Sequence, residues 1–139
     1  MKVLLDTNII LDNLLRREPS IINVRKIYSM IADDLIEACV TANSITDIYY
    51  SAKKRIGNTA AIHAINTIIL THNIISIDKD DCVNALHSTI TDFEDALIVI
   101  CGMKNSVDYI ITNDQDFLKE TSYMNNVITP TQFLEKFIM

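Results

Sequence analysis

Four aspartates stand where an apolar stretch of the chain meets a polar turn or the start of a helix: Asp6, Asp47, Asp95 and Asp114. Carboxylate oxygens are the hard ligands that Mg²⁺ and Mn²⁺ prefer. A divalent cation held by carboxylates makes a bound water easier to deprotonate and offsets charge on a phosphate. If the fold gathers these acids, a cation or a proton must relieve their mutual repulsion. The pattern therefore suggests metal-assisted attack on a phosphate ester.

The elements that must position these acids follow from the apolar periodicity. Short apolar runs typical of buried strands cover residues 2–6, 37–41, 74–77, 108–112 and 126–129. The stretches between them have apolar residues at helical spacing, and the one that contains Ala96 to Cys101 is apolar on every side. Strands that alternate with helices predict a parallel sheet covered on both faces. The expected fold is thus a three-layer α/β/α sandwich with short strands.

A parallel sheet presents the carboxyl ends of its strands along one edge, where such folds bind ligands. Asp6 ends the first strand, and Asp47 lies in the first turns of the helix after the second. Asp95 lies in the first turn of the buried helix, and Asp114 lies two residues beyond the 108–112 strand. We therefore expect all four carboxylates on one rim, with Asp92 beside Asp95 on the same helix face. Asp116 lies near Asp114.

Each of these positions also has a purely structural explanation. Asp6 can cap the first helix. The pattern Thr91-Asp92-Phe93-Glu94 is typical of a capping box, in which Glu94 serves only the helix start. Asn43 is likewise expected to cap a helix that ends at Gly57. The evidence for a site is the shared rim rather than any single acid.

Length and composition limit the class of protein. A chain of 139 residues with 49% hydrophobic and 22% charged residues predicts one globular domain over 1–139. A net charge of -6 argues against non-specific binding to duplex nucleic acid. The longest uncharged stretch, residues 56–77, is too polar to span a membrane, and Asp6 interrupts the first apolar run before a signal peptide could form. We expect a cytoplasmic protein with reduced cysteines.

Three segments resemble the PIN-domain family: Leu4-Leu5-Asp6-Thr7-Asn8, Asp92-Phe93-Glu94-Asp95-Ala96-Leu97 and Thr112-Asn113-Asp114-Gln115-Asp116-Phe117. The resemblance spans nearly the whole chain. Short PIN proteins of this kind are similar to VapC-type toxins, which are metal-dependent ribonucleases paired with an antitoxin. The resemblance implies that the four rim aspartates form an acidic cluster, with Asn8 and Thr112 as nearby polar supports.

One position departs from that family, which usually has Glu where this chain has Asp47. The side chain is one methylene shorter, so we expect it to reach a metal only through water. On this interpretation Asp6 and Asp95 hold Mg²⁺ or Mn²⁺, and Asp114 holds a second metal or orients the attacking water. Asp47 then completes the cage or acts as a local base. The number of metals stays open.

The expected substrate is single-stranded or loop RNA, because an unpaired strand can bend a phosphate into a concave acidic site. Three basic clusters are candidate RNA contacts, although each is equally typical of a solvated surface: Arg16-Arg17, Arg25-Lys26 and Lys53-Lys54-Arg55. The expected partners are an antitoxin and a second copy of the chain, since apolar surface can remain after the core closes. Candidate residues for the dimer face are the Tyr and Met side chains of the early helices: Tyr28, Met30, Tyr49 and Tyr50.

Two alternative functions remain open at this point. A phosphoaspartyl enzyme would place a second carboxylate two residues after Asp6, where this chain has Asn8. A receiver domain would need a lysine just after a late strand, and residues 113–115 contain none. The stronger alternative is a non-catalytic PIN-like module that binds RNA or protein.

Overall fold

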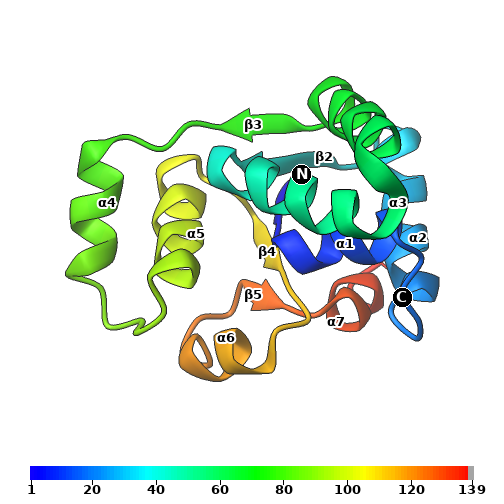
Figure 1. Ribbon diagram of the computed structural model, residues 1–139. Coiled ribbons are helices and arrows are strands. Elements are labelled where there is room, and N and C mark those ends of the chain that lie inside the picture. The colour runs from blue at the N-terminus through cyan, green and yellow to red at the C-terminus, as the bar shows by residue number, and fades with distance from the viewer. Residues whose placement is uncertain (138–139) are drawn as a thin grey trace.

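The computed structural model describes residues 1–137 and contains a five-stranded parallel sheet (Figure 1). The strand order is β3-β2-β1-β4-β5, and every neighbouring pair is parallel. The strands are β1 Lys2–Leu5, β2 Glu37–Thr41, β3 Asn73–Ile75, β4 Tyr109–Ile111 and β5 Val127–Ile128. The short parallel strands expected from the apolar runs are therefore confirmed.

Helices cover both faces of this sheet. They are α1 Thr7–Leu14, α2 Ile21–Ala32, α3 Ala42–Thr71, α4 Lys79–Leu86, α5 Phe93–Lys104, α6 Gln115–Glu120 and α7 Pro130–Glu135. Successive residues of β1 point to opposite faces: Val3 and Leu5 pack with α1, α2, α3 and α7, whereas Leu4 packs with α4, α5 and α6. This alternation produces two apolar cores and confirms the three-layer α/β/α fold.

The helix expected to be the most buried is α5. Its buried residues are Ala96, Leu97, Ile98, Val99, Cys101 and Gly102. A Cβ atom on Gly102 would lie 3.0 Å from Cδ1 of Ile110, so the glycine allows α5 to pack closely against β4. The body of α5 packs between α4 and the sheet, and this packing places the first turn of the helix at the carboxyl ends of the strands.

Two expected helix caps were wrong, whereas the helix end expected at Gly57 is confirmed. Helix α3 begins at Ala42, directly after Thr41, so Asn43 does not cap it. At Gly57 a φ of 83° and a ψ of 168° are not helical, and α3 consists of two helices that meet there at a kink. Asp92 caps α5 in place of Thr91, and its Oδ1 accepts a hydrogen bond from the Asp95 N–H at 3.0 Å.

Within residues 1–137, no helix combines the length and the apolar character needed to cross a bilayer.

Candidate active site

A cavity of about 320 Å³ opens where β1, β2 and β4 lead into the following segments. Its acidic lining contains Asp6, Asp47, Asp92, Glu94, Asp95 and Asp114. A second cavity of about 810 Å³ shares Asp92, Asp95 and Asp114 and adds Asp116. The structure thus brings the four rim aspartates together, with Asp92 between the two cavities and Asp116 on the outer side.

Asp6 is the most deeply placed of these acids, with only 7% of its surface exposed. Its Oδ1 accepts the Thr7 N–H at 2.8 Å, so it does cap α1. Its Oδ2 accepts the Thr112 hydroxyl at 2.7 Å and the Asn8 side-chain amide at 3.3 Å. Burial raises the pKa of Asp6, although the hydrogen bonds from Thr112 and from the Thr7 N–H act in the opposite direction. Asn8 and Thr112 therefore orient this carboxylate, in the supporting positions predicted for them.

Asp95 experiences the strongest electrostatic conflict in the cluster. Burial, together with the charges of Asp92, Asp6 and Asp114, raises its pKa to about 7. Within the described residues the two ion pairs are Arg17 with Asp12 and Lys104 with Asp81, so neither neutralises the cluster. Near neutral pH this carboxyl thus exchanges a proton readily and lacks a cationic partner.

The turn after β4 places Asp114 beside Asp6. The Asp114 N–H donates to the Thr112 hydroxyl oxygen at 3.0 Å, while that hydroxyl donates to Asp6. Oδ1 of Asp114 caps α6 by accepting the N–H groups of Asp116 and Phe117 at 2.9 and 3.2 Å. Thr112 is therefore a direct link between the two acids, whereas Asp116 meets Asp114 only through its backbone.

Glu94 and Asn43 line the acidic cavity, although neither was predicted from the sequence as a site residue. Because Asp92 caps α5, Glu94 is not engaged in a capping box, and burial together with the charges of Asp47 and Asp92 raises its pKa. The preference for Asp over Thr as a helix cap is the sequence signal that pointed to Asp92 as the cap and so left Glu94 free. Oδ1 of Asn43 is buried and has no hydrogen-bond partner. No sequence signal pointed to it once it had been interpreted as a cap.

The donor chemistry of the cavity fits a hard divalent cation. Its acidic groups supply carboxylate oxygens, and the unpaired amide oxygen of Asn43 is a further acceptor that a cation or a hydroxyl donor would satisfy. Within residues 1–137, however, no three His, Cys, Asp or Glu side chains are grouped closely enough to hold an ion as they stand. The site has suitable ligands but not a preformed cage.

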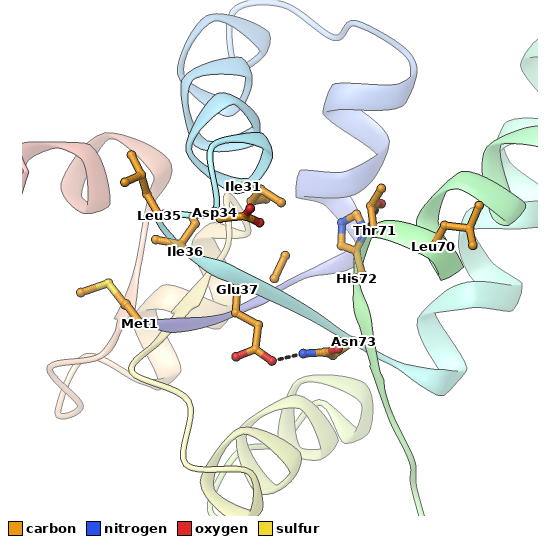
Figure 2. Close-up of a pocket in the computed structure, with 11 residues that line it drawn as sticks. Met1, Ile31, Asp34, Leu35, Ile36, Glu37, Leu70, Thr71, His72 and Asn73 are labelled. Carbon is orange, nitrogen blue, oxygen red and sulfur yellow. Dashed lines mark hydrogen bonds between the residues drawn. The ribbon is translucent and has the colours of Figure 1, made fainter.

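The opposite end of the sheet has a different character. A cavity of about 310 Å³ there is lined by Met1, Leu35, Glu37 and His72 among others, and Figure 2 shows Glu37 hydrogen-bonded to Asn73. Among the described residues, Asp34 and Glu37 are the two that supply carboxylates to that lining. The acids gather at the carboxyl ends of the strands, as the topology predicted.

Comparisons with known proteins agree with this architecture. Residues 2–116 match the family model described as PIN domain. No curated protein sequence matches significantly. A toxin-antitoxin complex from Klebsiella pneumoniae is similar in structure, with a TM-score of 0.68, 20% identity, and 92% of this chain and 97% of that chain covered.

Two further solved structures share the fold. The Sarcin-Ricin loop cleaving toxin VapC20 from Mycobacterium tuberculosis has a TM-score of 0.69 and 13% identity, covering 84% of this chain and 93% of that one. VapBC-1 from nontypeable Haemophilus influenzae has a TM-score of 0.63 and 15% identity, with 94% and 99% covered. At such low identities these likenesses establish the fold. With the family model matching most of its length, the chain belongs to the PIN-domain family.

Proposed function

We propose that this PIN-domain protein is an endoribonuclease that depends on Mg²⁺ or Mn²⁺ and serves as the toxin of a toxin-antitoxin pair. The observation that carries the proposal is the convergence of Asp6, Asp47, Asp95 and Asp114 on one cavity. Family membership and the toxins among the structural neighbours support the same class, and one neighbour is named as a Sarcin-Ricin loop cleaving toxin.

Asp6, Asp95 and Asp114 are the residues that would hold the cation. When bound, the cation would acidify a water molecule and offset phosphate charge during hydrolysis of the phosphodiester bond. Thr112 holds the Asp6 carboxylate in place and supports the backbone of Asp114. Asp47, half-buried in the same cavity, is placed to orient the attacking water or accept its proton.

The surroundings of the acids favour an unpaired RNA strand. The acidic cluster lies between two adjoining cavities, so a flexible strand could occupy both while one phosphate meets the acids. Of the described residues that line these cavities, Lys119 is the one with a basic side chain, and it supports a phosphate contact. The predicted basic clusters line neither cavity: Arg17 faces Asp12, and Lys53 lies over the Tyr49 ring.

An antitoxin partner is supported by the neighbours that are toxin-antitoxin complexes. A mostly apolar cavity of about 370 Å³ lies among α1, α2 and α3, and its lining on α3 includes Ala60, Ala64 and Ile68. We propose this surface for an apolar segment of the antitoxin. Co-expression with a small protein encoded beside the gene should give a stable complex, and Ala60→Asp, at an exposed position of the lining, should weaken it.

A homodimer is also proposed, although the expected dimer face needs revision. Tyr28 and Met30 pack against the core, and the Tyr28 hydroxyl lies 3.0 Å from Nε2 of His72. Tyr50 is 61% exposed and is the better candidate. Light scattering at micromolar protein should give a dimer mass that Tyr50→Asp reduces. A monomer at all concentrations would contradict the dimer.

The decisive experiment incubates wild type and Asp95→Asn with a panel of single-stranded and hairpin RNAs in Mg²⁺, Mn²⁺ or EDTA. Wild type should cleave with either metal, whereas the variant and the EDTA samples should not. Asp33→Asn is a matched control, because Asp33 is an exposed acid at the end of α2. Equal cleavage by wild type and Asp95→Asn, or cleavage that survives EDTA, would contradict the proposal.

The alternative is a non-catalytic PIN-like module that binds RNA or protein. The observation that favours it is the lack of a preformed three-residue cage among residues 1–137. The same experiment separates the two functions. Retention of an RNA on a filter, with no cleavage in any metal, would support the binding module.

A further inference from the structure

A buried acid outside the acidic cluster is tied to the turn that carries Asp114. Asp12, in the last part of α1, is 7% exposed. Its Oδ2 accepts a hydrogen bond from the Asn113 side-chain amide at 3.1 Å, and Arg17 lies 3.8 Å from its Oδ1. The same amide nitrogen donates to the Ser20 hydroxyl oxygen at 2.7 Å. One amide group therefore connects the turn after β4 with α1 and with the start of α2.

The neighbours of Asn113 in the chain are both part of the proposed active site. Thr112 donates to Asp6, Asp114 lines the acidic cavity, and the Asn113 N–H donates to Oδ1 of Asn8 at 3.4 Å. The turn after β4 is thus hydrogen-bonded to Asp6 and Asn8 at the start of α1, and to Asp12 near the end of the same helix. These hydrogen bonds attach the turn to this part of the chain at two separate points.

We propose that Asn113 and Asp12 are positioning residues that set the location of the Asp114 carboxylate opposite Asp6. The inference rests on the proposed nuclease function, because it assigns these residues to the same reaction. An amide is needed at position 113, since its NH₂ group donates to a carboxylate and to a hydroxyl at once. A carboxylate at this position would face Asp12 as a like charge. Support of this kind holds reacting groups within about 0.5 Å of their working geometry.

A charge-swap experiment tests the inference. Asn113→Asp places two carboxylates face to face, and Asp12→Asn on its own preserves an acceptor for Asn113. The double variant Asp12→Asn with Asn113→Asp restores an amide-carboxylate pair in reversed order and the original net charge. Cleavage rates, the Mg²⁺ concentration for half-maximal cleavage and the Mg²⁺-induced shift in Tm are measured for all four proteins. Asn84→Asp is the matched control, because Asn84 is exposed on α4 and lines none of the cavities around the turn.

Asn113→Asp should lower kcat by roughly tenfold to a hundredfold, as loss of an outer partner of a ligand does, with little change in KM. It should also reduce the Mg²⁺-induced Tm shift. The double variant should recover most of both, which a general loss of fold stability would not allow. The inference is overturned if wild type cleaves and Asn113→Asp cleaves equally well, or if the double variant is no better than Asn113→Asp.

The two proposals fail in different ways. If wild type shows a Mg²⁺-induced Tm shift but cleaves no RNA, the nuclease proposal fails. The positioning inference is then judged by whether Asn113→Asp loses that shift and the double variant regains it. If wild type shows neither cleavage nor a shift, both proposals are overturned together.

Discussion

The two ends of α5 place a carboxylate in opposite electrostatic environments. At the C-terminal end, Lys104 Nζ lies 2.5 Å from Oδ2 of Asp81, which is 3% exposed. The lysine and the Asp78 N–H hold the pKa of Asp81 below its ordinary value. At the N-terminal end, burial and neighbouring carboxylates raise the pKa of Asp95 to about 7. Asp81 is thus paired with a cation, whereas Asp95 is surrounded by like charges.

The helix itself does not account for this difference. The positive end of the α5 macrodipole lies at Asp95 and favours its ionised form by about 0.3 to 1 kcal/mol. Burial and the charges of Asp92, Asp6 and Asp114 outweigh that contribution. Clustered acids that oppose one another are typical of a functional site, whereas the Asp81–Lys104 pair serves packing of α4 on α5. The comparison predicts different outcomes for substitutions at the two ends.

The largest effect is expected from Asp6→Asn, which tests whether the acidic end is functional. Cleavage should be lost, since a ligand charge is removed from the cluster. Asn caps α1 as well as Asp does, and relief of repulsion should leave the free energy of unfolding without metal unchanged or higher by about 1 kcal/mol. RNA cleavage and thermal melts with and without Mg²⁺, at low ionic strength, check this. A variant that keeps full cleavage and the full Mg²⁺ shift would falsify the metal assignment.

The second prediction concerns pH. The pKa of Asp95 is about 7 in the fold against an ordinary value of 3.8, so the folded state binds this proton more tightly. The free energy of unfolding without metal should therefore fall as pH rises from about 4 to about 7, by about 2 kcal/mol after allowance for solvent screening, and level off above that. Urea melts of wild type and Asp95→Asn across this range measure the difference. Parallel pH profiles for the two proteins would refute the assignment of the slope to Asp95.

A smaller effect is expected at the C-terminal end of α5, where Lys104 pairs with Asp81. Lys104→Met leaves the buried Asp81 carboxylate without its cation, so Tm should fall by a few degrees while RNA cleavage at a permissive temperature stays unchanged. Because the pKa of Asp81 is lowered in the fold, its stabilising contribution is present above its ordinary pKa and disappears as pH falls through the folded value. Lys79→Met, at an exposed site on α4, is the control. Loss of cleavage in Lys104→Met would show that the two ends are not independent.

The smallest effect is expected from Asp47→Glu, which restores the longer side chain usual in the family. The added methylene should bring the carboxylate closer to a bound cation and lower the Mg²⁺ concentration for half-maximal cleavage by about threefold. Titration of cleavage against Mg²⁺ measures this, with Glu94→Gln as a comparison for charge in the same cavity. A higher Mg²⁺ requirement in Asp47→Glu would indicate that the shorter side chain is adapted to this site.

Local sequence signals succeeded where one interaction dominates. The pattern Thr129-Pro130-Thr131-Gln132 is typical of a capping box, and Thr129 and Gln132 form one at the start of α7. The apolar body of α5 is buried. Local sequence signals failed where two neighbouring residues could each cap the same helix. Thr91 and Asp92 could both cap α5, and in the structure Asp92 is the cap, so that Glu94 lies in the cavity instead of completing a capping box with Thr91. The Asn43 prediction also failed, since α3 begins at Ala42, two residues earlier than a cap at Asn43 would place it.

By itself the sequence determined the layers of this protein and the rim on which its acids lie. Periodicity identifies strands and helices, and parallel strands must align their carboxyl ends, so Asp6 and Asp114 could be placed together without coordinates. Tertiary structure alone decided the partners of each carboxylate. Hydrogen bonds such as Thr112 to Asp6 or Asn113 to Asp12 join residues 106 and 101 positions apart, and they depend on distances that no local pattern encodes. Burial, which raises the pKa of Asp95, likewise exists only once the elements have packed.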